Sequence, residues 1–192
     1  VPQLRTRTAA DFIWAANTLA SLGYAEVNLN LGCPSGTVTA KGKGAGFLAH
    51  PDELDRFLDA VFSACTVPIS IKTRLGVHDP AEFEALLEIY SRYPVAELTI
   101  HPRVRQDFYK GRVRADAFAA ALPHCPIPVC YNGDLVSERG IRETIERYPS
   151  LSAFMLGRGL LGDPSLVTRV RGGERASSAR LQAFHDTLFA RY

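Results

Sequence analysis

Short apolar runs alternate along this chain with longer segments whose apolar residues recur at helical spacing. Residues 27–31 and 98–101 are typical of the short runs, which we interpret as buried strands. Residues 51–62 are typical of the longer segments, and Pro51 suits the first turn of a helix. In that segment the apolar positions share one helical face: Leu54, Phe57, Leu58, Val61 and Phe62.

The same alternation extends over most of the chain and predicts six strands, each followed by a helix. Strand and helix in regular succession favour a parallel sheet that helices cover or close. The predicted strands are residues 1–4, 27–31, 68–72, 98–101, 127–131 and 153–156.

Several helix starts are marked by capping residues. Residues 8–11, Thr-Ala-Ala-Asp, resemble a capping box with Asp in place of the usual Glu. Residues 79–80, Asp-Pro, are expected to cap the helix after the third strand. Ser137 is expected to cap a later helix, with Ile141 and Ile145 facing inward.

Each predicted strand ends in a polar or glycine-rich turn. Functional residues at successive strand ends indicate a (β/α)₈ TIM barrel, in which the active site lies at the carboxyl face. Six units fall two short of eight, so the barrel is expected to be incomplete. A doubly wound sheet is the alternative, but no G-x-G-x-x-G follows the first strand, and no P-loop occurs.

The chain is expected to be a fragment at both ends. It begins with Val1, and its C-terminal residues stop within an amphipathic pattern. Residues 1–172 are interpreted as the partial barrel. Residues 173–192 are either the last barrel helix or the start of a further helical region, with one apolar face formed by Leu181, Phe184, Leu188 and Tyr192.

The composition is that of a globular domain. Of 192 residues, 46% are hydrophobic and 22% charged, and no apolar run approaches membrane-spanning length. The net charge of +2 neither requires nor excludes a nucleic-acid partner. The four cysteines include no C-x-x-C pair, so we expect no metal site, no disulfide framework and a cytoplasmic location. We also expect a monomer that does not bind membranes.

Cys33 is the candidate reactive residue. Gly32 and Pro34 flank it where a strand breaks into a loop rich in Gly and Lys. We expect its thiol to lie at the carboxyl tip of a rigid strand, beside a mobile basic loop. By spacing alone, a buried structural cysteine remains an equal alternative.

A set of short motifs resembles the signature of the tRNA-dihydrouridine synthases. Their order and intervals are similar to those of that family from about Gln3 to Pro164. The motifs are residues 30–34 (NLGCP) followed by Gly42, Gly44, Ala45 and Gly46, then residues 72–76 (KTRLG), 101–103 (HPR), 109–111 (YKG), 132–134 (NGD) and 157–159 (GRG).

The resemblance implies a TIM-barrel flavin enzyme that reduces the C5–C6 bond of uridine in tRNA. It implies FMN as cofactor, NADPH as reductant, Cys33 as the acid that protonates C5, and Asn30 facing the uracil. A free thiol, with a pKa of about 8.5, carries its proton at neutral pH, which suits an acid.

Three strand-end residues are implied to contact the flavin ring. Lys72 would stabilise negative charge on the reduced flavin, although a snorkelling surface lysine is the alternative. His101 would contact the flavin, although a hydrogen-bonded core histidine is the alternative. Gln3 matches a family glutamine that contacts the isoalloxazine.

Two turns after the last two predicted strands are candidates for the FMN phosphate site. They are Asn132-Gly133-Asp134 and Gly157-Arg158. Barrels often bind phosphate in these two loops, where glycine N–H groups approach the anion and an arginine pairs with it.

Two loops on the same face carry clustered cations, with Phe108 and Tyr109 interleaved. Such a surface suits an RNA backbone that leads to an extruded base. The cations are Lys41, Lys43, Arg103, Arg105, Lys110, Arg112 and Arg114. Of these two loops, we assign Lys41, Lys43, Arg103, Arg105, Tyr109 and Lys110 to substrate binding.

The chain departs from the family pattern at Pro102 and Val104, where Gly and Thr are usual. The Ala-Pro-Met segment that lines the flavin in the family is also absent. Two alternative functions therefore stay open. One is another FMN-dependent barrel reductase acting on a small pyrimidine or enone, and the other is a flavin-free tRNA-binding remnant.

Overall fold

The computed structural model describes residues 1–191, which divide into two compact units. The first unit comprises residues 1–133 and 151–155, and the second comprises residues 134–150 and those from 156 onward. The strands, all in the first unit, are β1 (Gln3–Leu4), β2 (Val27–Asn30), β3 (Ile69–Arg74), β4 (Leu98–His101), β5 (Val129–Tyr131) and β6 (Ala153–Phe154).

In the described part of the chain, these strands form one six-stranded parallel sheet in the order β1-β2-β3-β4-β5-β6. The sequence order is kept throughout, without the reversal that defines a doubly wound sheet. The doubly wound alternative is therefore wrong. An unbroken series of parallel strands with helical crossovers fits an incomplete (β/α)₈ barrel.

The two faces of the sheet differ in chemistry because successive residues of a strand point to opposite faces. One face is apolar and buried, and comprises Val27, Leu29, Ile69, Ile71, Leu98, Ile100 and Val129. The strand register places a polar set on the other face: Gln3, Asn28, Asn30, Ser70, Lys72, Thr99 and Cys130.

The polar face carries its own hydrogen bonds. The Asn28 side chain accepts a 2.8 Å bond from Gln3 and donates a 2.9 Å bond to the Ser70 hydroxyl. Ser70 in turn donates to the Glu26 carboxylate. The face is thus polar and hydrogen-bonded, although Asn28, Ser70 and Thr99 are buried.

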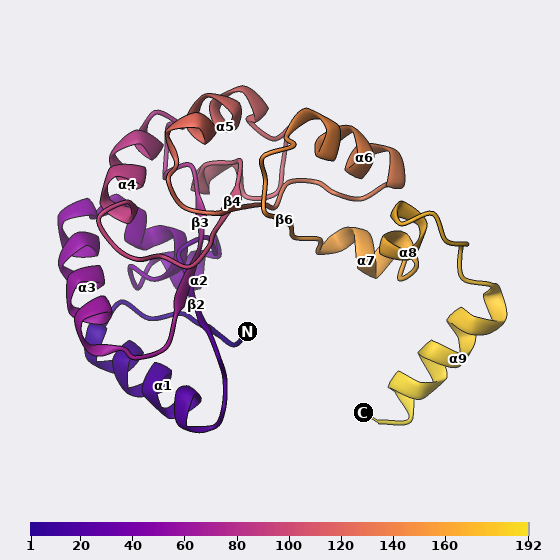
Figure 1. Ribbon diagram of the computed structural model, residues 1–192, viewed down its shortest axis with the longest axis horizontal. Coiled ribbons are helices and arrows are strands. Elements are labelled where there is room, and N and C mark those ends of the chain that lie inside the picture. The colour runs from indigo at the N-terminus through magenta and orange to yellow at the C-terminus, as the bar shows by residue number, and fades with distance from the viewer. Residues whose placement is uncertain (192) are drawn as a thin grey trace. The chain divides into compact units, whose positions relative to one another are not determined.

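Helices of the first unit follow one side of the strands (Figure 1). The longer ones are α1 (Ala9–Ser21), α3 (Pro51–Ala64), α4 (Glu82–Tyr90) and α5 (Ala115–Ala121). Phe12 of α1 packs edge-on against Phe57 of α3, with ring centroids 6.0 Å apart. The predicted helix after Pro51 is confirmed, with Leu54, Leu58 and Val61 buried.

One predicted cap is confirmed and the other differs from the structure. The Asp79 carboxylate accepts a 2.8 Å hydrogen bond from the Ala81 N–H ahead of α4, which begins at Glu82. The Glu82 carboxylate in turn accepts hydrogen bonds from the backbone N–H groups of residues 77–79. Thr8 is the N-cap of α1, but its side chain makes no capping bond, and its N–H donates to the Thr6 hydroxyl.

The second unit contains α6 (Glu138–Arg147), α7 (Arg158–Gly162), α8 (Leu166–Val170) and α9 (Ser178–Phe189). The Ser137 cap is confirmed, since its hydroxyl accepts a 3.2 Å bond from the Gly140 N–H. Ile141 is buried, but Ile145 is 40% exposed, so its predicted inward position is wrong. Helix α8, against which α6 packs, has only five residues and leaves the last turns of α6 open.

Helix α9 contains no buried residue. Its predicted apolar face is present, but Phe184 and Leu188 are exposed, and Tyr192 lies outside the described residues. Among the described residues, no helix is both long enough and apolar enough to span a membrane.

Candidate active site

The carboxyl end of β2 positions Cys33 through the side chain of Asn30. The side-chain oxygen Oδ1 of Asn30 accepts hydrogen bonds from the backbone N–H groups of Gly32 (3.1 Å) and Cys33 (3.0 Å). Its amide nitrogen donates a 2.7 Å bond to the Gln3 side chain. Asn30 therefore fixes the turn that presents Cys33, with the predicted flavin contact Gln3 beside it.

The loop after Cys33 is packed, contrary to the expectation of a mobile loop. It forms α2 (Gly36–Thr39) and the 3₁₀ helix η1 (Gly44–Ala49), in which residues 44–48 are buried. Gly44 has φ +56°, and a Cβ there would lie 2.8 Å from the carbonyl oxygen of Cys33. The glycine-rich stretch thus packs closely against the Cys33 backbone and supports it.

The Cys33 thiol is half-buried and has two cations close by. The Arg5 Nη1 donates a 3.4 Å hydrogen bond to Cys33 Sγ. Lys72 lies near enough for the two side chains to interact electrostatically. Strand pairing brings Asn30 opposite Lys72, so Gln3, Asn30, Cys33 and Lys72 form one cluster.

Lys72 is a largely buried cation on the polar face. Burial, followed by repulsion from Arg74, lowers the pKa of Lys72 from 10.5 to about 8. Among the described residues, no carboxylate contributes to this shift. Lys72 therefore suits an anionic group bound over the polar face, and a reduced flavin would present such a negative charge.

Arg74 is a further site residue that sequence reasoning did not select. Its side chain is 1% exposed, and its guanidinium donates to the carbonyl oxygens of Gly32 (2.7 Å), Val104 (3.0 Å) and Phe108 (2.8 Å). It also lies over the Tyr109 ring, 5.3 Å from the centroid. Its place two residues after Lys72, on the same face of β3, was the available signal.

His101 and Arg103 lie inside the loop that follows β4. His101 is buried, and its Nε2 lies 3.0 Å from Arg103 Nη1. Arg103 was expected to face RNA, but it is 1% exposed and donates to the carbonyl oxygens of Lys110 and Gly111. Its role in this structure is to hold the loop, so the expected surface position is wrong.

The other predicted substrate-binding residues lie nearer the surface. Lys41, Tyr109 and Lys110 are exposed, whereas Lys43 and Arg105 are half-buried. The Tyr109 ring also lies 6.1 Å from the ring of His101, which joins the loop to the strand end. Tyr109 thus lies against the buried residues His101 and Arg74 at the strand ends.

The two predicted phosphate turns are divided between the units, with Asn132 and Gly133 in the first unit and Asp134, Gly157 and Arg158 in the second. Asn132 donates a 2.8 Å bond to the carbonyl oxygen of Met155, which ties β5 to the segment after β6. A side chain at Gly133 would lie 2.7 Å from the Tyr131 hydroxyl. In the second unit, Arg158 donates a 2.7 Å bond to the Asp134 carboxylate, and Gly157 is the N-cap of α7. The combined phosphate site stays a prediction.

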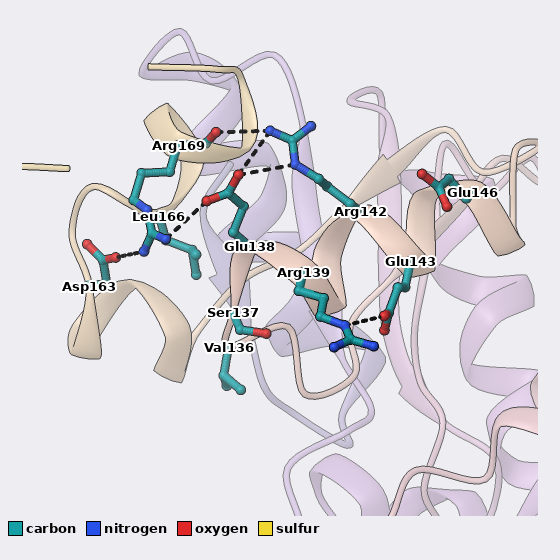
Figure 2. A pocket seen from close by; sticks show the side chains of 10 residues that line it. All are labelled: Val136, Ser137, Glu138, Arg139, Arg142, Glu143, Glu146, Asp163, Leu166 and Arg169. Carbon is teal, nitrogen blue, oxygen red and sulfur yellow. Dashed lines mark hydrogen bonds and ion pairs between the residues drawn. The ribbon is translucent and has the colours of Figure 1, made fainter. Parts of the chain in front are cut away.

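A cavity of about 520 Å³ in the second unit is lined by charged residues of α6 and α8 (Figure 2). The charges pair with one another. Arg169 contacts both Glu138 (3.1 Å) and Asp163 (3.0 Å), and Arg142 also pairs with Glu138 (3.1 Å). The network joins the two helices and does not resemble a ligand site.

The structure describes no group of three or more His, Cys, Asp or Glu residues that could hold a metal ion. It describes all four cysteines as free thiols.

Fold and site together define a class: a parallel α/β enzyme scaffold whose reactive side chains gather at the carboxyl edge of its sheet. The family model described as "Dihydrouridine synthase (Dus)" matches residues 1–190, and the chain belongs to this family.

Curated relatives agree with this assignment. The chain is 34% identical over 171 residues to the "Probable tRNA-dihydrouridine synthase" of Rhodobacter capsulatus, covering 88% of this chain and 52% of that protein. It is 31% identical over 153 residues to tRNA-dihydrouridine synthase B of Pasteurella multocida, covering 79% and 46%. The chain thus spans about half the length of the curated relatives it matches.

A solved protein of the dihydrodipicolinate synthase family from Coccidioides immitis superposes with a TM-score of 0.62 at 16% identity, covering 90% of this chain and 52% of that one. At this identity the likeness concerns the fold alone.

Proposed function

We propose that this chain is the core of an FMN-dependent tRNA-dihydrouridine synthase that uses NADPH as electron source. The observation that carries the proposal is the cluster of Cys33, Asn30 and Lys72 at adjoining strand ends, in a chain of the dihydrouridine synthase family. A tRNA substrate implies a cytoplasmic enzyme, and we propose a monomer.

The cofactor would supply a hydride to C6 of the uracil. The residues of the chain supply the rest. Cys33 Sγ gives its proton to C5 and regains one from solvent, since the thiol is half-buried. Arg5, 3.4 Å from the sulfur, stabilises the thiolate left behind.

The remaining residues bind and orient. Lys72, as the cation without a carboxylate among its described neighbours, would face the negative charge of reduced FMN. Gln3 and His101 would contact its ring, and Asn132, Gly133, Asp134, Gly157 and Arg158 would hold its phosphate. Asn30 would present Cys33 to the uracil.

The proposal is tested by two measurements on the purified chain. We expect added FMN to remain with the protein through gel filtration and to show flavin absorption bands. With NADPH and an unmodified tRNA transcript, we expect dihydrouridine. Cys33→Ala should retain the flavin and lose activity by at least about a hundredfold, the scale of a general acid. Cys65→Ala, at a half-buried cysteine on α3's C-cap, is the matched control.

Three outcomes would contradict the proposal in different ways. Full activity of Cys33→Ala would remove the acid assignment. Reduction of a free pyrimidine or enone but not of tRNA would favour the alternative reductase. A colourless protein that still binds tRNA would favour the flavin-free remnant.

A further inference from the structure

Phe108 is an exposed aromatic residue in a strained backbone. It lies in the loop between β4 and α5, with φ +50° and a side chain that is 46% exposed. A left-handed φ costs free energy in a bulky residue, and glycine adopts it readily. Because the ring is half in solvent, packing does not account for the choice of phenylalanine.

The backbone of Phe108 is tied to the Cys33 strand end by a single side chain. The Arg74 guanidinium donates to the carbonyl oxygen of Phe108 (2.8 Å) and to that of Gly32 (2.7 Å). The two carbonyl groups therefore lie within the span of one guanidinium. The backbone of Phe108 is therefore held near the residue that precedes Cys33.

Cations flank Phe108 in the sequence of this loop. Arg105 and Lys110 lie within three residues, and the exposed Arg112 follows. The next residue, Tyr109, is 57% exposed and lies under Arg74, so both aromatic side chains of the loop reach solvent and Tyr109 also contacts a buried cation. Exposed aromatic rings among cations are the usual platform for unpaired bases of RNA.

We propose that Phe108 is the platform on which the base next to the target uridine stacks. This inference rests on the proposed function, because it takes RNA as the ligand and Cys33 as the place of the uridine. The strain at Phe108 is then explained, since the left-handed backbone holds the ring toward the flanking nucleotide. The cations bind the phosphates on either side.

The test is the affinity of the flavin-free chain for a fluorescein-labelled single-stranded oligouridylate and for a tRNA transcript, by fluorescence anisotropy at one fixed salt concentration. We expect Phe108→Leu and Phe108→Gly to weaken binding of both by about fivefold to a hundredfold, the scale of one lost base–aromatic stack. Phe108→Trp should stay within about threefold of the unaltered chain. Trp14→Ala removes another exposed aromatic, on α1, and should change nothing.

Phe108→Gly also relieves the left-handed backbone, so its melting temperature should equal or exceed that of the unaltered chain while its RNA affinity falls. A structural residue would not separate the two properties. Unchanged affinity of Phe108→Leu, an equal loss in Trp14→Ala, or no RNA binding by the unaltered chain would overturn the inference. No flavin or NADPH is present, so failure of the flavin chemistry gives a separate result.

Discussion

Lys72, Arg74 and Arg103 are three cations that the chain withdraws from solvent at one edge of its sheet. The two arginines donate to backbone carbonyl oxygens, and both interact electrostatically with the Asp107 carboxylate. The Lys72 ammonium group makes no hydrogen bond among the described residues, and no carboxylate contributes to its lowered pKa of about 8. Lys72 is therefore the cation of this edge that is most in need of an anionic ligand.

The lowered pKa of Lys72 predicts how stability depends on pH. Between pH 8 and pH 10.5 the unfolded chain keeps the Lys72 proton and the folded chain loses it. The free energy of unfolding should therefore rise with pH over this window, by at most about 3 kcal/mol, because each pKa unit is worth about 1.4 kcal/mol.

Urea unfolding of the flavin-free chain and of Lys72→Met, at intervals from pH 7 to pH 10.5, measures this effect. Subtracting the free energy of unfolding of Lys72→Met from that of the unaltered chain removes the contribution of the other groups that titrate. We expect this difference to increase as pH rises. Parallel curves would show that Lys72 is solvated like a surface lysine.

The positions of candidate-site residues at strand ends could be predicted from the sequence, whereas the position of a residue in the loop after β4 could not. Cys33, Lys72 and His101 follow apolar runs, so their place at the carboxyl edge follows from the pattern. Arg103 has the same local pattern but is buried, because the loop through residues 104–111 folds back and offers it carbonyl oxygens. A charge in the sequence does not reveal whether such acceptors will surround it.

At the scale of elements, all six strands and the helices between them follow from periodicity, but the hydrogen bonds at two helix starts do not. Thr6 accepts the Thr8 N–H, which a capping box gives to the side chain of residue 11, and Glu82 accepts three N–H groups ahead of α4. The glycine-rich loop also differs from its pattern. Its composition is typical of a mobile segment, yet Gly42, Gly44 and Gly46 are sites of close packing.

Gly44 provides the test of that packing. Gly44→Ala would place a Cβ 2.8 Å from the Cys33 carbonyl oxygen, at φ +56°. The oxygen is a backbone atom and the Cβ is attached directly to the backbone, so neither atom can move away without a backbone shift. We expect a loss of about 1–3 kcal/mol in the free energy of unfolding and a changed rate of Cys33 alkylation by iodoacetamide.

Gly36→Ala is the matched control, since no atom lies within 4 Å of its added Cβ and its φ is not positive. In α2 the alanine should be neutral or stabilising. Equal behaviour of the two variants would show that the loop gives way at Gly44 and does not support Cys33.

At the scale of the whole molecule, the chain forms a sheet of six strands and spans about half of its curated relatives. The sheet is well supported by α1, α3 and α4, whose buried faces pack on it and on one another. Helix α9 lacks such support, because none of its residues is buried.

A helix of twelve residues without tertiary packing is marginal in water. We therefore expect the amides of α9 to exchange with deuterium within seconds, while those of α3 stay protected for far longer. Hydrogen–deuterium exchange with mass spectrometry compares the two helices in one sample. Protection of α9 comparable to that of α3 would mean that something covers its exposed Phe184 and Leu188.

Arg74 and Arg103 both hold the loop after β4 by its main-chain carbonyl oxygens, at Val104, Phe108, Lys110 and Gly111. Every residue type brings the same carbonyl group, so these bonds survive a change of side chain. The side chains of the loop can therefore change while its backbone keeps the same path. A randomised library at residues 105, 106, 108 and 110 should therefore yield many folded members, from which variants can be selected for the RNA binding proposed above without changes to the rest of the fold.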